Sequence, residues 1–407
     1  MNNLEIGPIL RALMRNKVGA ALIAIQIAFT MTIIVNAISI IQERDRLMAR
    51  ESGLDEANSF YIDSNGFTED FNTQVSITED LDRIRRLPGV ISAVQTNAIP
   101  MSGSGWSMSL QIEPGAELDG TDAAVYMVDE NGIETMDLEL LAGENFSPTD
   151  VRWRLPSQSD WPDKAIITQA MAEALFPDLG WQQAVGKTIY IQSDEPIIIS
   201  GIVDKLQAPW VGWSSLELSV LTPEHPLFGS ARYLIRTEPG MLDRVMPNVE
   251  ELLVSTNPDR IVRNLTSMED RRVESYREHG AMITMLKLIM LVLTLVTALG
   301  IVGLASFSVN RRKKQIGIRR ALGATQSAIL RHFMVENFLI STIGVLLGAA
   351  LAVGLNIVLV NQFSLTPIDW YLVPAGMITL WIVGQLAVYG PARRAATIPP
   401  ATATRTV

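Results

Sequence analysis

Four long stretches without a charged residue constrain this chain more than any other feature of its sequence. They cover residues 18–41, 288–310, 337–368 and 370–392. A helix that crosses a bilayer needs about 20 apolar residues, and each stretch is at least that long. A buried core helix could imitate one of them, but four stretches bounded by charges or turn residues predict a membrane protein with four spans.

The charges of the chain are divided so unevenly that they predict its orientation. Residues 43–280 contain 40 acidic and 19 basic residues, whereas the rest contain 3 acidic and 14 basic residues. Basic residues beside membrane spans stay on the cytoplasmic side. With four spans, the basic clusters before the first span, between the second and third, and after the fourth all fall on one side. We therefore expect a multi-pass protein of the inner (plasma) membrane with both termini in the cytoplasm and residues 43–280 outside.

The outer block shows the alternation of strands and helices typical of an α+β domain. Segments rich in β-branched residues, 123–128, 187–192, 196–203 and 231–236, predict strands. Periodic segments 78–90, 168–180 and 241–258 predict helices, and the charged segment 268–279 predicts a helical stalk leading into the second span. The expected fold class is an α-helical membrane protein with four transmembrane helices and a large extracytoplasmic α+β domain between helices 1 and 2.

These expectations divide the whole chain into consecutive segments. In order, they are a cytoplasmic interfacial helix (1–17), a first span (18–41), the outer domain with its stalks (42–280), a second span (281–310), a cytoplasmic loop and helix (311–332), a third span (333–361), an outer loop (362–369), a fourth span (370–391) and a cytoplasmic tail (392–407).

The sequence offers no catalytic or metal-binding pattern. There is no cysteine, and the three histidines are scattered without metal-ligand spacing. A loop from Gly180 to Thr188 looks like a phosphate-binding loop, but five residues instead of four separate its glycines, and a strand instead of a helix follows. We therefore expect a chain that is not an enzyme and holds no cofactor of its own.

The basic run RRKKQIGIRRALGAT, residues 311–325, lies between the second and third apolar stretches and has no acidic residue. It lacks interleaved aromatic residues and is flanked by membrane spans, which argues against nucleic-acid binding. Its positive charge fixes topology, but topology alone does not require the segment IGIRRALGA. The charged residues Lys287 and Glu336, near opposite ends of spans, are expected to reach the membrane surface.

Residues 311–356 resemble the permease signature of MacB/FtsX-type ABC transporters. That signature is a basic E/Q-I-G-I-R-x-A-x-G-A loop, then a helix with a glutamate near its membrane entry, then a glycine-rich span. The matching residues are Gln315, Ile316, Gly317, Ile318, Arg319, Ala321, Gly323, Ala324 and Glu336. Gln315 stands where the family usually has glutamate. The outer segments AIITQAMAEALFPDLGWQQAVGKTIYI and IIISGIVDK also resemble the family, whereas the tail IPPATATRTV departs from its usual ending.

The resemblance implies a permease subunit that transmits ATP-driven motion to its outer domain. Two permease chains, identical or related, would pair with each other, and each would bind a separate ABC ATPase that holds ATP and magnesium. The ATPase-coupling residues would be Gln315, Ile316, Gly317, Ile318, Arg319, Arg320, Ala321, Leu322, Gly323 and Ala324. By helical spacing, Ile318, Leu322, Thr325 and Ile329 should share one face.

Gly300, Gly303, Gly344 and Gly348 are expected to allow close helix packing in the membrane, where lipids surround the spans. The favoured function is export through a periplasmic adaptor and an outer-membrane duct. The alternatives are an FtsX-like permease that controls a cell-wall hydrolase or senses a peptide, and a permease that releases lipoproteins.

Overall fold

The computed structural model describes residues 17–115, 120–192, 194–363 and 366–399. The interfacial helix expected at residues 1–17 lies outside the described residues except for Lys17, and so does the end of the tail from residue 400. The chain forms two compact units. One contains residues 1–48 and 279–407, and the other contains residues 49–278.

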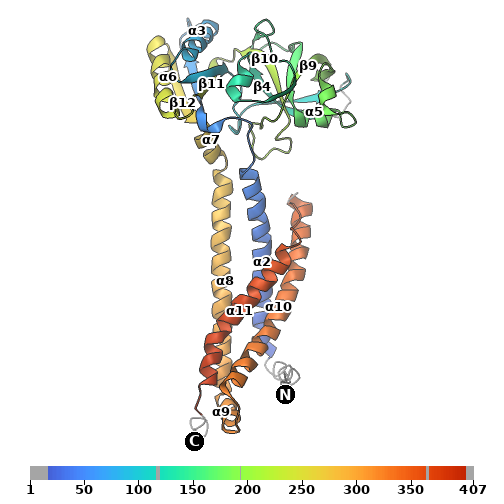
Figure 1. The fold of residues 1–407 in the computed structure, drawn as a ribbon, viewed down its shortest axis with the longest axis vertical. Coiled ribbons are helices and arrows are strands. Elements are labelled where there is room, and N and C mark those ends of the chain that lie inside the picture. The colour runs from blue at the N-terminus through green and yellow to red at the C-terminus, as the bar shows by residue number, and fades with distance from the viewer. Residues whose placement is uncertain (1–16, 116–119, 193, 364–365, 400–407) are drawn as a thin grey trace. The chain divides into compact units, whose positions relative to one another are not determined.

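The first unit contains four long apolar helices, which confirms the predicted four-span architecture. They are α2 (Lys17–Met48), α8 (Arg277–Arg311), α10 (Gln326–Phe363) and α11 (Leu372–Ala396). Each is long and apolar enough to cross a membrane. A short helix, α9 (Lys313–Ala321), follows α8 at the end of the unit where α10 begins and α11 ends (Figure 1). The helices α2 and α8 continue well beyond the charge-free stretches, so charged residues occupy their ends.

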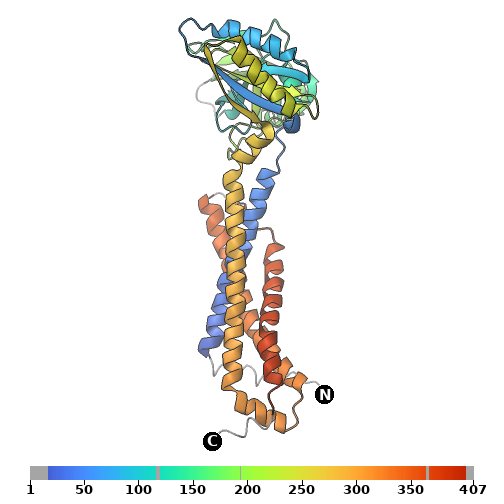
Figure 2. The ribbon, with the colours of Figure 1, turned by 90° about the vertical axis from the view of Figure 1, so that its left-hand side faces the viewer.

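The second unit begins with a four-stranded antiparallel sheet in the order β12-β1-β11-β2. Two helices, α3 (Thr73–Arg85) and α6 (Leu242–Thr256), pack on this sheet, as Figure 2 shows. Their apolar side chains form a buried core with those of the sheet. The strands are β1 (Ser59–Gly66), β2 (Val90–Gln95), β11 (Ser230–Thr237) and β12 (Arg260–Ser267).

A second, larger sheet of mixed direction completes this unit. Its order is β4-β3-β8-β9-β7-β10-β6, with β5 paired to β9. A further parallel pairing between β10 and β4 closes the strands from β4 to β10 into a ring. The strands are β3 (Trp106–Gln111), β4 (Thr121–Val128), β5 (Leu140–Gly143), β6 (Arg152–Arg154), β7 (Lys164–Thr168), β8 (Thr188–Ile191), β9 (Glu195–Val203) and β10 (Ser219–Pro226). The short helices are α4 (Gly132–Met136), α5 (Gln169–Leu175) and α7 (Met268–Ser275).

The predicted α+β character of the outer block is therefore confirmed, with one correction at its end. The segment 268–279 is not a single helix continuous with the next span, because α7 ends at Ser275 and α8 begins at Arg277. The break falls at Tyr276, which is 2% exposed and whose hydroxyl accepts a hydrogen bond from the Gln207 amide at 3.0 Å. Burial of this side chain in the outer unit explains why the chain turns there.

Candidate functional site

The basic run folds into the helix α9 and a tight turn that leads into α10. The turn depends on Gly323, whose φ of +97° lies in the left-handed region that favours glycine. Its amide donates to the carbonyl of Arg320 at 3.1 Å, and the Ala324 amide donates to that of Arg319 at 3.0 Å. These two bonds are the usual glycine-terminated end of a helix. The Thr325 hydroxyl then caps α10 by accepting from the Ala328 amide at 3.2 Å.

The helix α9 has one buried and one exposed side. Ile316 is 5% exposed and packs, with Gly317 nearby, on a cluster formed by the ends of α8, α10 and α11. On the opposite side, Ile318 is 48% and Leu322 is 83% exposed. The structure places the remaining predicted coupling residues as follows: Gln315, Arg319, Ala321 and Gly323 are exposed, and Arg320 and Ala324 are half-buried.

The prediction that Ile318, Leu322, Thr325 and Ile329 share one helical face is wrong. Ile329 is 4% exposed and belongs to the buried cluster, whereas Ile318 and Leu322 face away from it. The reason is the turn at Gly323, which ends one helix before the next begins, so helical spacing does not carry across it. The exposed side of α9 is therefore smaller than expected but keeps both large apolar side chains.

This exposed side also carries positive charge. Lys313, Lys314 and Arg319 are exposed, and Arg319 and Arg320 form no ion pair with any other described residue. The two arginines lie in the last turn of α9, where a positive charge is favoured by the helix dipole. The result is an exposed surface at one end of the helix bundle, in which Ile318 and Leu322 lie near Arg319, a cation that pairs with no described acidic residue.

Immediately before α9, Arg312 forms an ion pair that the sequence analysis missed. Its guanidinium lies 2.9 Å from the carboxylate of Glu336 on α10. Glu336 is 8% exposed, so its side chain is enclosed by neighbouring protein groups. A charge inside a bundle is retained where a partner of opposite sign neutralises it. The signal in the sequence was the presence of opposite charges at the same predicted end of two consecutive spans.

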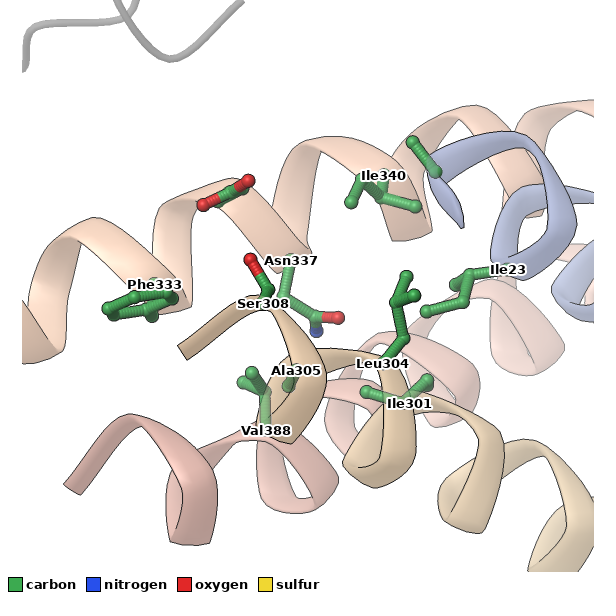
Figure 3. A pocket seen from close by; sticks show the side chains of 11 residues that line it. Ile23, Ile301, Leu304, Ala305, Ser308, Phe333, Asn337, Ile340 and Val388 are labelled. Carbon is green, nitrogen blue, oxygen red and sulfur yellow. The ribbon is translucent and has the colours of Figure 1, made fainter. Parts of the chain in front are cut away.

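Glu336 also lines a cavity between the helices, with a volume of about 40 Å³. Ser308 of α8 and Asn337 of α10 reach into it among apolar side chains from all four long helices (Figure 3). The Asn337 amide donates to the carbonyl of Gly384 on α11 at 2.9 Å. Two adjacent residues of α10 therefore connect it to its neighbours, one to the residue before α9 and one to α11.

The four glycines predicted to pack helices have different surroundings. A Cβ added at Gly344 would lie 2.7 Å from the carbonyl oxygen of Ala24, and one at Gly348 would lie 2.8 Å from that of Ala28, so both lie against α2. At Gly300 it would meet the Gln26 side chain at 2.5 Å. At Gly303 it would meet no described atom within 4 Å, so this glycine packs against no described helix.

Hydrogen bonds between helices accompany these contacts. The Thr32 hydroxyl donates to the carbonyl of Gly348 at 3.3 Å, and the Asn36 amide donates to that of Ala352 at 3.2 Å. Both bonds join α2 to α10. The helices α2 and α8 are joined by a bond between the hydroxyls of Thr30 and Thr297 at 2.8 Å. Among the described residues, no group of three or more histidine, aspartate or glutamate side chains could hold a metal ion.

Comparison with known proteins agrees with this architecture. The family described as MacB-like periplasmic core domain matches residues 20–260, and the family described as FtsX-like permease C-terminal matches residues 287–400. Together these matches define a membrane component of an ABC transporter. The chain belongs to the MacB/FtsX-type family of ABC transporter permeases. Membership in general implies an ATPase partner and dimerisation.

Individual relatives are distant. The chain is 25% identical over 295 residues to the ABC transporter permease YknZ of Bacillus subtilis, covering 70% of each chain. It is 27% identical over 283 residues to the macrolide export ATP-binding/permease protein MacB of Neisseria gonorrhoeae, covering 67% of this chain but only 40% of that protein. The solved periplasmic region of MacB from Actinobacillus actinomycetemcomitans is 17% identical, with a TM-score of 0.34, and covers 54% of this chain and 94% of that one.

Proposed function

We propose that this chain is the permease subunit of an export-type ABC transporter and that α9 is the contact through which a separate cytoplasmic ATPase drives it. The observation that carries this proposal is the exposed side of α9. Ile318 and Leu322 are apolar yet exposed, next to the unpaired Arg319. Apolar side chains surrounded by charge are typical of a protein-binding surface.

The fold supports transmission of motion rather than catalysis in this chain. The helices α2 and α8 both lead by direct chain connection into the outer domain, so a displacement of the membrane helices reaches that domain through the backbone. ATP and magnesium would be held by the ATPase, and both chain termini and α9 would lie in the cytoplasm. A second permease chain would complete the complex.

Export is the favoured task because one of the relatives is named as a macrolide export protein. In this proposal the outer domain works with a periplasmic adaptor and an outer-membrane duct. The regulatory and lipoprotein-releasing alternatives use the same coupling surface, so the first test addresses that surface.

The test reverses two charges on α9 and compares the effect with a matched reversal elsewhere. Arg319→Glu combined with Arg320→Glu should weaken ATPase binding on the order of tenfold, about 1.4 kcal/mol, because acidic groups on the ATPase would then face like charges. The control is Arg393→Glu combined with Arg394→Glu, an exposed pair at the end of α11. Binding is measured by titrating the ATPase onto the purified chain in nanodiscs.

The control matters because both variants remove the same charge from the same end of the bundle. An equal loss of binding in both variants would mean that the arginines act only through net charge, and unchanged binding in the first would reject α9 as the coupling helix. Adaptor-type proteins that copurify with the native complex would support export, whereas a cell-wall hydrolase would favour the regulatory alternative.

A further inference from the structure

The ion pair between Arg312 and Glu336 lies at the point where a force on α9 would enter the helix bundle. Arg312 is the residue between α8 and α9, and its backbone, with φ −102° and ψ 10°, departs from the helical conformation. Its side chain is 20% exposed and that of Glu336 is 10% exposed. The pair therefore joins the bend between two helices to the interior of a third.

The pair is costly to break, which suits a mechanical link. Removal of one partner from a buried ion pair leaves an uncompensated charge, whereas an exposed pair contributes little. The ion pair of Arg46 with Asp369 at the other end of the unit shows the contrast, since its side chains are 61% and 37% exposed. The pair of Arg312 with Glu336 is the less exposed of the two, so it should contribute more to holding its segments together.

The residue next to Glu336 extends the link to a further helix. Asn337 is 5% exposed and donates to the carbonyl of Gly384 on α11. A Cβ added at Gly384 would lie 3.4 Å from the Asn337 amide nitrogen and 3.0 Å from the Ser341 hydroxyl. The absence of a side chain at Gly384 thus lets α10 and α11 approach each other beside the ion pair.

Further along the chain, α10 packs closely against α2. Gly344 and Gly348 lie about two and three turns beyond Asn337, and a Cβ added at either would meet backbone atoms of α2. Because neither glycine leaves space for sliding, α10 and α2 should move together. The helix α2 continues to Met48 and leads directly into the outer domain.

The cavity beside the pair supplies room for a rearrangement. It is lined by Ser308 of α8 and by Glu336 and Asn337 of α10, and its volume would hold two or three water molecules. Close-packed interiors resist small displacements, so a cavity at this position lets the end of α10 shift relative to α8 without a clash.

We propose that Arg312 and Glu336 are positioning residues that transmit the movement of α9 into α10, and through α10 into α2. This inference rests on the proposed function, because it takes α9 as the contact with the ATPase. The pair does not bind the ATPase itself, since Glu336 is buried. Loss of the pair should therefore separate ATPase binding from the movement that ATP causes.

The experiment measures both properties on the same complex. The chain contains no cysteine, so Lys287→Cys on α8 and Asn361→Cys on α10, both exposed, provide two unique positions for spin labels. The distance between the labels is recorded by pulsed electron paramagnetic resonance for the permease–ATPase complex in nanodiscs, with and without ATP. We expect ATP to shift this distance in the labelled parent chain.

Glu336→Gln should leave ATPase binding within twofold of the parent and abolish the ATP-dependent shift. Arg312→Glu combined with Glu336→Arg should restore the shift, because the exchanged charges can pair again. Arg312→Lys, which keeps the positive charge, should retain part of the ATP-dependent shift. Arg311→Gln is the matched control, since Arg311 is exposed and adjacent, and it should shift like the parent.

Three results would overturn the inference. The first is an undiminished shift in Glu336→Gln, and the second is a failure of the exchanged pair to restore the shift in an assembled complex. The third is loss of membrane insertion or of ATPase binding in both Glu336→Gln and Arg312→Lys, which would make the pair purely structural. Absence of ATPase binding by the parent chain would instead overturn the proposed function, and this inference with it.

Discussion

The two helices that connect the membrane unit to the outer domain, α2 and α8, are similar in length and apolarity but differ in packing. In the apolar 18-residue segment that could cross a membrane, 50% of the residues of α2 are buried, compared with 11% of those of α8. Residues such as Met31 and Val35 of α2 are fully buried, whereas Leu291 and Leu299 of α8 are 58% and 68% exposed. The helix α2 is thus the centre of the bundle, and α8 lies at its edge.

This difference indicates a division of roles between the two connections. The helix α2 is fixed to α10 by close glycine contacts and hydrogen bonds, so it follows α10. The helix α8 is joined to α2 by few contacts and leaves an apolar side uncovered by described residues. Lipid or the second permease chain would cover that side in the membrane.

The largest expected effect breaks the contact between α2 and α10. In Gly348→Leu, the first added carbon would lie 2.5 Å from the Met31 Cβ and 2.8 Å from the Ala28 carbonyl oxygen. Overpacking of this kind costs about 1–3 kcal/mol. Unfolding of the chain in detergent micelles should therefore shift strongly toward lower denaturant concentration.

The matched control for this variant is Gly354→Leu on the same helix. An added Cβ there meets no described atom within 4 Å, and Gly354 is exposed, so the chain should be as stable as the parent or slightly more stable. If both leucine variants lost equal stability, the account of α2 as a tightly packed partner of α10 would be wrong.

A smaller effect is expected for the contact between α2 and α8. The hydroxyls of Thr30 and Thr297 share a hydrogen bond of 2.8 Å. A double-mutant cycle with Thr30→Val and Thr297→Val should give a coupling energy of about 0.6 kcal/mol, the usual value for bonds between membrane helices. Thr294→Val serves as control, because that hydroxyl donates within its own helix to Met290. A coupling energy of several kcal/mol would show that α8 is held as firmly as α10.

Much of the architecture could be predicted from the sequence, because charge decides which segments enter a membrane. The absence of charge over residues 18–41 and 288–310 located two spans directly. Strands rich in β-branched residues, such as β9 and β11, were also predictable. Strand β12, with the sequence RIVRNLTS, was not, because its polar residues find their partners in distant segments, as Arg260 does in Asp80 of α3.

The candidate site was predictable in position but not in geometry. The motif located α9, yet its exposed side depends on the turn at Gly323, which separates Leu322 from Ile329. The pair of Arg312 with Glu336 spans 24 residues, and it forms only because α10 packs back beside the end of α8. Such distant contacts are set by tertiary packing, which local spacing does not encode.

The most direct test of the central claim, that α9 contacts the ATPase, is a cross-link from a single introduced cysteine. Because the chain has no cysteine of its own, Leu322→Cys and Ile316→Cys each carry one reactive position, the first exposed and the second buried. After cross-linking in native membranes, mass spectrometry identifies the attached protein. We predict an ABC ATPase attached at residue 322 and much less at residue 316. No ATPase at residue 322, or equal amounts at both positions, would contradict the account.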